Sequence, residues 1–124
     1  MPEVEIRFFK EDNGSVPCDE WLRSLSREKQ AKCYAALGRL RRYGWELRRP
    51  HVENLGDGIW ELRIRIENLQ YRILYFFHGR RAVVLSHGIV KKSNAVPPVD
   101  IEKAKWRKVR FEENPEGRTW EEES

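Results

Sequence analysis

The chain has 124 residues, of which 40% are hydrophobic, 11% aromatic and 35% charged. A chain of this length forms one domain with a modest core, which excludes a large doubly wound enzyme or a (β/α)₈ barrel. The many aromatic residues argue against disorder, and no apolar run reaches the roughly 18 residues that span a bilayer. Because the first residues also lack the pattern of a secretory signal, we expect a cytoplasmic protein without a membrane partner.

The formal net charge of +4 is unevenly distributed along the chain. Residues 112–124 hold six acidic residues and one basic residue, so residues 1–111 carry 23 Lys and Arg against 14 Asp and Glu, a net charge of +9. We therefore predict a basic domain over residues 1–111 and an acidic, solvated C-terminal tail over residues 112–124. A domain this basic suits an acidic partner such as nucleic acid, an acidic protein or anionic lipid.

The first part of the chain predicts one strand and two helices. Residues 3–9 are β-prone and alternate at first, which favours a strand. Ser15 is a candidate N-cap for a short helix, and Ser26 is one for a longer helix that ends at Gly44. The apolar residues of the longer helix predict a buried stripe of Ala31, Tyr34, Leu37 and Leu40, widened by Ala35.

Three strands and a helix are predicted next. Residues 59–67 alternate between apolar and charged side chains, which is typical of a half-buried antiparallel strand. Residues 70–77 and 82–87 give the second and third strands of a meander, with Gly88 ending the last one. A basic helix follows over about 98–111, with a thin apolar side at Ile101, Ala104 and Val109. The predicted class is α+β, in the order β-α-α-β-β-β-α, with an antiparallel sheet packed by an N-terminal helical hairpin.

Three arginines fall on the polar face of the predicted hairpin. Arg63 and Arg65 lie on its first strand and Arg72 on its second, with Arg65 nearly opposite Arg72 if the turn is near residue 68. Like charges that face each other destabilise a sheet by up to about 1 kcal/mol, a cost that a bridging anion would remove. Guanidinium groups match phosphate oxygens, so this face is a candidate phosphate site. The alternative is a solvated face with arginines paired to Glu61 or Glu67.

Further basic and aromatic residues are candidates for the same chemistry. His87 ends the third strand and is followed by Lys91 and Lys92, which makes this segment a candidate for proton transfer and phosphate binding. A histidine at a strand end is also often only partly exposed. Phe76 falls on the arginine face, where it would either stack on a base or belong to the core.

The last helix and the cysteines allow simpler interpretations. Lys105 and Lys108 belong to a basic stripe that would either follow a phosphate backbone or be an ordinary solvated face. Cys18 and Cys33 have neither CxxC nor zinc-site spacing, so we expect reduced, buried thiols. Since the sequence also lacks nucleotide-binding, P-loop and metalloprotease motifs, we expect neither a metal nor a cofactor.

Three strings carry a family resemblance. They are LGDGIWELR at residues 55–63, YRILY at residues 71–75 and LSHGIVKK at residues 85–92, followed by prolines and IEKA at residues 101–104. Together they resemble the RelE/ParE superfamily of bacterial toxins, and in particular its HigB-like, phage-derived-toxin-like branch, over about residues 3–111. The resemblance implies that family's compact RelE-like fold.

The resemblance also implies an activity. Such toxins of type II toxin–antitoxin systems enter the ribosomal A site and act as mRNA interferases: they inhibit translation by metal-independent attack of a ribose 2′-OH on the adjacent phosphate. Carried over by position, Arg63 and Arg72 would bind the scissile phosphate, Arg65 would support them, and His87, Lys91 or Lys92 would transfer protons. The implied partners are the ribosome, mRNA and a cognate antitoxin, expected to be a small helix-turn-helix protein.

Two alternatives stay open. A ParE-like relative would inhibit DNA gyrase without cutting RNA, and a decayed, non-catalytic toxin would only bind an antitoxin or RNA. Many relatives carry a tyrosine near the end of the domain that stacks on an mRNA base, whereas this chain has only Trp106 and Phe111 there.

Overall fold

The computed structural model describes residues 3–91 and 95–121, which form a six-stranded sheet with helices on both faces. The elements in chain order are β1 (Glu5–Phe9), α1 (Pro17–Arg23), α2 (Arg27–Tyr43), the 3₁₀ turn η1 (Gly44–Glu46), β2 (Val52–Gly56), β3 (Ile59–Ile66), β4 (Leu69–His78), β5 (Ala82–Lys91), α3 (Pro98–Glu113) and β6 (Thr119–Trp120). None of the described helices is long and apolar enough to cross a membrane.

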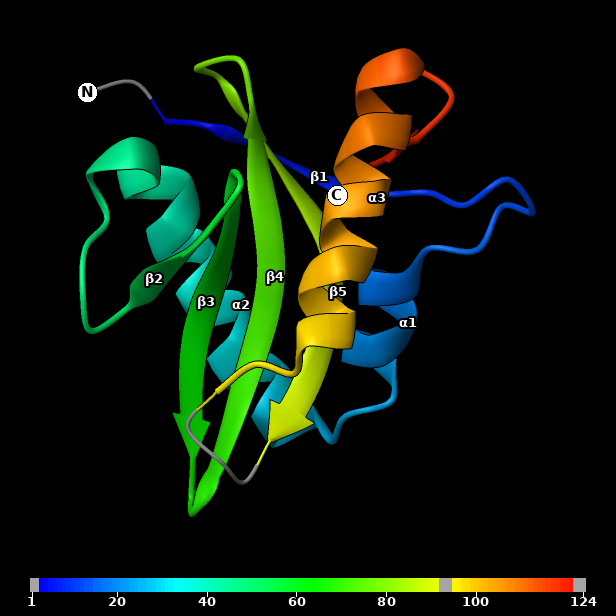
Figure 1. Cartoon of the computed structure of the whole chain (residues 1–124). Helices are drawn as coiled ribbons and strands as arrows, with labels where there is room; N and C mark the ends of the chain where they lie inside the picture. The colour runs from blue at the N-terminus through cyan, green and yellow to red at the C-terminus, as the bar shows by residue number, and fades with distance from the viewer. Residues whose placement is uncertain (1–2, 92–94, 122–124) are drawn as a thin grey trace.

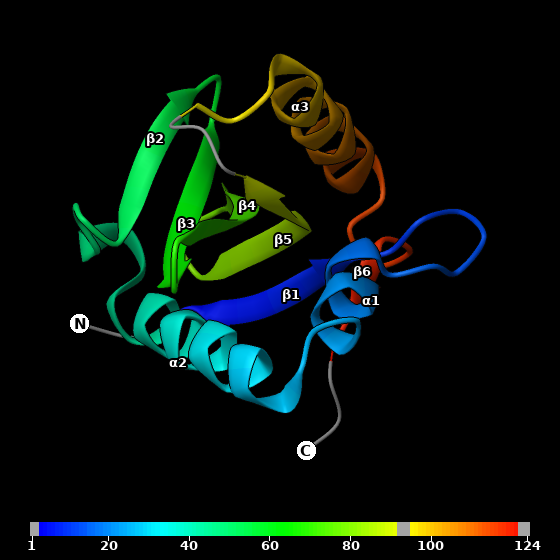
Figure 2. The same ribbon diagram turned by 90° about the horizontal axis from the view of Figure 1, so that it is seen from below.

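The sheet separates two hydrophobic cores. Helices α1 and α2 cover one face and α3 covers the other, as the view from below shows (Figure 2). The larger core joins α1 and α2 to the sheet, with Leu22 and Leu40 fully buried, and the smaller core joins α3 to the opposite face through Phe76 and Phe111. This arrangement confirms the predicted α+β class and the packing of the N-terminal helical hairpin.

The sheet order is β2-β3-β4-β5-β1-β6. Strands β3 to β5 are antiparallel as predicted, and β2 joins them antiparallel to β3, but β1 pairs in parallel with β5, so the sheet is mixed. Two edge strands, β2 and β6, were not predicted. Strand β6 pairs with the end of β1, and Trp120 packs edge-on against Phe8 with ring centroids 5.2 Å apart. This part of the predicted solvated tail is therefore packed against the sheet.

The helix boundaries test the predicted caps. The Ser26 hydroxyl accepts a hydrogen bond from the Lys29 backbone N–H, and Gly44 ends α2 with a positive φ, as predicted. The prediction for Ser15 is wrong, because the N-cap of α1 is Val16. Its backbone N–H donates instead to the carboxylate of Glu20, one turn into the helix.

The buried faces of two helices differ from the predicted stripes. In α2 the residues that face the core are Cys33, Ala36, Leu37 and Leu40, whereas Ala31, Tyr34 and Ala35 are exposed. In α3 the inward-facing residues are Ala104, Arg107 and Phe111, whereas Val109 is exposed. Both cysteines are buried free thiols.

Strand β5 does not end at Gly88 but continues to Lys91. Gly88 faces α1, and a Cβ at this position would overlap the indole ring of Trp21. The glycine therefore allows a helix to approach the sheet closely, which is a common reason for a glycine within a strand. A register shift between β4 and β5 leaves Ser86 as an extra, bulged residue just before His87.

Candidate active site

The hairpin of β3 and β4 sets two arginines side by side. Arg63 lies directly opposite Arg72, and Arg65 lies opposite Gln70. The predicted pairing of Arg65 with Arg72 is therefore wrong by two residues. Directly opposite residues of an antiparallel pair have Cβ atoms about 4.5–5.5 Å apart, so the two cationic side chains start from neighbouring positions on one face.

A buried carboxylate lies between these arginines. Glu61 is only 2% exposed, and its Oε2 lies 2.8 Å from Nε of Arg63 while its Oε1 lies 3.2 Å from Nε of Arg72. The alternative of arginines paired with Glu61 is thus correct for the ion pair, but this part of the face is not solvated. The carboxylate offsets the repulsion between two cations that would otherwise face each other alone.

The two arginines differ in accessibility. The side chain of Arg72 is 6% exposed, and its Nη atoms donate to Oε1 of Gln70 at 2.9 Å and to the Tyr71 carbonyl at 3.1 Å. The side chain of Arg63 is 33% exposed. Burial lowers the pKa of Arg72, but a guanidinium stays protonated in proteins. Arg72 is thus a buried, permanently charged neighbour of the more accessible Arg63.

Lys91 extends this cluster from the neighbouring strand. It lies opposite Gln70 at the end of β5 and is buried. Its pKa is lowered by burial and by the positive charges of Arg72 and Arg63, while Glu61 acts in the opposite direction. A lysine with a lowered pKa can exchange a proton nearer to neutral pH. We refer to Arg63, Arg72 and Lys91 around Glu61 as the cation site.

The cation site lies on a part of the sheet that α3 does not cross, and Arg63 is its most exposed member. In Figure 1, α3 crosses in front of β5, while β3 and the lower half of β4 have no helix in front of them. Arg65 is exposed and belongs to the same face of β3. The structure therefore brings Arg63, Arg65, Arg72 and Lys91 together, and Lys92 lies outside the described residues.

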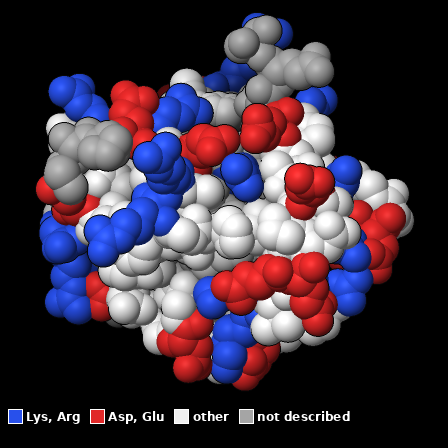
Figure 3. Space-filling view, turned by 90° about the horizontal axis from the view of Figure 1, so that it is seen from above, with Lys and Arg blue, Asp and Glu red and all other residues white. Residues whose placement is uncertain are grey.

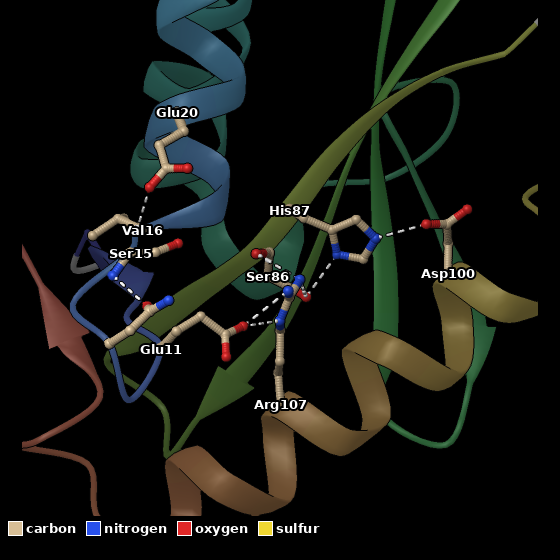
Figure 4. A network of polar contacts seen from close by, with 9 residues as sticks. Glu11, Ser15, Val16, Glu20, Ser86, His87, Asp100 and Arg107 are labelled. Carbon is tan, nitrogen blue, oxygen red and sulfur yellow. Dashed lines mark hydrogen bonds and ion pairs between the residues drawn. The ribbon is translucent and has the colours of Figure 1, made fainter.

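His87 belongs to a different network, shown in Figure 4. Its Nε2 lies 3.0 Å from Oδ1 of Asp100 in the first turn of α3, and its Nδ1 lies 2.8 Å from the hydroxyl of Ser86. Because a carboxylate only accepts, the neutral ring carries its proton on Nε2 and accepts from Ser86 at Nδ1. Arg107 continues the network from Ser86 to Glu11, whose Oε1 accepts from its Nε at 2.9 Å.

This network links a serine, a histidine and an aspartate in the same succession as a catalytic triad, but it is not accessible to a substrate as a triad is. Ser86 is fully buried, and its oxygen also lies 3.4 Å from a guanidinium nitrogen of Arg107. His87 itself is 7% exposed, and both of its ring nitrogens contact protein atoms. These contacts fasten α3 to β5. His87 therefore belongs to this network, whereas Lys91 lies with Arg63 and Arg72 in the cation site.

The His87 network predicts a loss of stability in mild acid. Burial is the largest cause that lowers the pKa of His87 in the folded protein, with Arg107 and Lys103 adding to it against the effect of Asp100. The unfolded state then binds more protons below its pKa of about 6.5, so the free energy of unfolding falls as the pH drops from 6.5 towards 5. Thermal unfolding across this range should show a smaller fall for His87→Gln than for wild type. An equal fall in both proteins would contradict the prediction, and His78→Gln is the control because it keeps His87.

Three other candidates lie elsewhere. Phe76 is fully buried against Phe111 of α3, so the prediction that it stacks on RNA bases is wrong. The amine of Lys105 lies 3.2 Å from a carboxylate oxygen of Asp57, and that of Lys108 lies 3.3 Å from one of Glu112. RNA binding by these two lysines stays a prediction.

The face of the molecule that is seen from above carries mixed charge (Figure 3). On the face seen from above in Figure 3, basic and acidic side chains are interspersed around an uncharged band. Among the described residues, no group of histidines, cysteines and carboxylates has the arrangement of a metal site. The sequence pattern predicted Glu61 only as a partner of arginines on a solvated face. Its position on the same strand face as Arg63 and Arg65 was the signal that could have placed it in the site.

A comparison with models of protein families gives a match. Residues 20–109 match the family model described as phage derived protein Gp49-like. The chain belongs to this family. The Gp49-like family is a family of RelE/HigB-like toxins associated with toxin–antitoxin systems, and membership implies an antitoxin as a partner. No curated protein matches the chain.

Proposed function

We propose that this Gp49-like protein is the toxin of a type II toxin–antitoxin pair, in the HigB-like branch of the RelE/ParE superfamily, and cuts mRNA on the ribosome. The observation that supports this proposal is the convergence of Arg63, Arg72 and Lys91 on one sheet face, around the buried Glu61. Two permanent cations beside an amine of lowered pKa suit a reaction that adds negative charge to a phosphate.

The proposed reaction uses the RNA's own nucleophile. Neutral Lys91 accepts the proton of the ribose 2′-OH, whose oxygen attacks the adjacent phosphorus. Arg63 and Arg72 stabilise the extra negative charge of the five-coordinate phosphorane. The bond to the 5′-oxygen then breaks, water protonates that oxygen, and the products are a 2′,3′-cyclic phosphate and a 5′-OH.

Replacing Lys91 with arginine tests this assignment. Lys91→Arg keeps a positive charge but cannot deprotonate near neutral pH, so cleavage should slow by about 10²–10⁴-fold. In wild type the rate should rise with pH and level off at the lowered pKa of Lys91, since only the neutral amine acts as a base. The measurement is the cleavage rate of a short mRNA on programmed ribosomes across this pH range.

Expression without an antitoxin provides the matching test in cells. We expect growth arrest and mRNA fragments that carry 2′,3′-cyclic phosphate and 5′-OH ends. Lys32→Arg, an exposed lysine of α2, is the matched control and should arrest growth as wild type does. Growth arrest with intact mRNA and a DNA-damage response would instead indicate gyrase inhibition, and full cleavage by Lys91→Arg would exclude Lys91 as the base.

A further inference from the structure

The feature that the proposed reaction leaves unexplained is the buried carboxylate within a site for anions. A negative charge beside a phosphate site weakens anion binding by simple repulsion. Glu61 is nevertheless almost fully buried, in contact with Nε of both Arg63 and Arg72. We propose that Glu61 is a positioning residue that fixes the two guanidinium groups as one anion-binding unit, a role that rests on the proposed function only for its effect on cleavage.

The two oxygens of Glu61 are divided between the arginines. Oε2 accepts from Nε of Arg63 at 2.8 Å, and Oε1 lies 3.2 Å from Nε of Arg72. Both contacts use Nε, the guanidinium nitrogen that is bonded to the aliphatic part of the side chain. For Arg63, the part of the chain that the structure describes shows no other side-chain hydrogen bond or ion pair, so its Nη edge stays available for a ligand.

Glu61 is also needed to keep the two cations together. Arg63 and Arg72 lie directly opposite each other, and Lys91 adds a third positive charge from β5. Without the carboxylate, three cations would face one another at the partly buried end of the sheet. Arg63, which is the most accessible of them, would then be free to turn towards solvent, because its described side-chain hydrogen bond is to Glu61 and Glu53 attracts it only weakly.

A neighbouring glutamate provides a control that distinguishes a positioning role of Glu61 from the effect of its negative charge. Glu53 lies directly opposite Glu61 on β2, and its pKa is lowered mainly by Arg49, with a smaller effect from Arg63. Its carboxylate binds the guanidinium of Arg49, outside the cation site. Glu53→Gln and Glu61→Gln therefore remove the same charge from adjacent strands, but only Glu61→Gln removes an oxygen that holds an arginine of the site.

The experiment is a titration of the full chain with inorganic phosphate, followed by the Nε–H resonances of the arginines. If Glu61 only adds negative charge, Glu61→Gln should bind phosphate more tightly than wild type. If Glu61 positions the arginines, Glu61→Gln should bind about tenfold more weakly, because one amide oxygen replaces two carboxylate oxygens and a fixed pair of cations is lost. Glu53→Gln should bind as wild type or slightly more tightly. Unchanged or tighter binding by Glu61→Gln overturns the proposal.

Glu61→Asp covers the case in which Glu61→Gln does not fold. It keeps the charge but withdraws the oxygens by one methylene. A positioning role therefore predicts weaker phosphate binding, whereas a pure charge role predicts unchanged phosphate binding. The cleavage assay on programmed ribosomes is read separately. If wild type binds phosphate through these arginines but cuts no RNA, the proposed function fails while the role of Glu61 stands. If wild type cuts RNA and Glu61→Gln cuts equally fast, the role of Glu61 fails.

Discussion

Replacing Arg72 with lysine is expected to reduce mRNA cleavage by about 10²–10³-fold and to abolish growth arrest. Lysine keeps one positive charge but cannot contact Glu61, Gln70 and the Tyr71 carbonyl at once, as the guanidinium does. The charge next to the phosphate is then no longer fixed when the phosphorane forms. The measurement is the rate of cleavage on programmed ribosomes together with the mapped ends of cellular mRNA.

Lysine is a better test than alanine at this position. Arg72→Ala would leave the buried Glu61 with one cation fewer, and breaking a buried ion pair costs about 3–5 kcal/mol. Loss of activity would then not separate catalysis from folding. Arg80→Lys, at the exposed turn between β4 and β5, is the matched control and should keep wild-type activity and stability. Wild-type cleavage by Arg72→Lys would remove Arg72 from the mechanism.

The position of Arg72 shows how far the sequence predicts the site. Strict alternation identified the two strands and the face that the arginines share, because side chains on a strand alternate between its faces. The register was missed by two residues, since the turn consists of Glu67 and Asn68, with Glu67 at a φ of 58°. The sequence has no glycine there to mark the positive φ. The turn lies one residue earlier than expected, and this places Arg63, instead of Arg65, opposite Arg72.

The burial of charged and aromatic side chains depends on tertiary contacts that periodicity does not contain. Phe76 and Arg72 lie on the same face of β4, yet α3 covers Phe76 while the side chain of Arg63, opposite Arg72, stays partly exposed. Residues at a spacing of three drift around a helix with 3.6 residues per turn, which explains why Tyr34 of the predicted α2 stripe is exposed while Cys33 faces the core. Strand β6 has only two residues, too few for any alternation.

Replacing Gly88 with alanine is expected to destabilise the fold by about 2–3 kcal/mol. The added Cβ would overlap the indole ring of Trp21, which lies between α1 and the sheet and also packs against Tyr71 at 6.1 Å between ring centroids. The ring cannot move without disturbing the larger core, so α1 would shift away from β5. Thermal unfolding should show a fall in Tm of roughly 10 °C for a domain of this size.

Gly38 provides the opposite case within the same fold. It lies in the middle of α2, and a Cβ there meets nothing within 4 Å, so Gly38→Ala should stabilise the protein by about 0.5–1 kcal/mol through a better helix propensity. The two substitutions add the same methyl group, and only the space around it differs. If Gly88→Ala unfolds at the same temperature as wild type, then Trp21 does not press on β5, and close packing of α1 is not the reason for a glycine inside this strand.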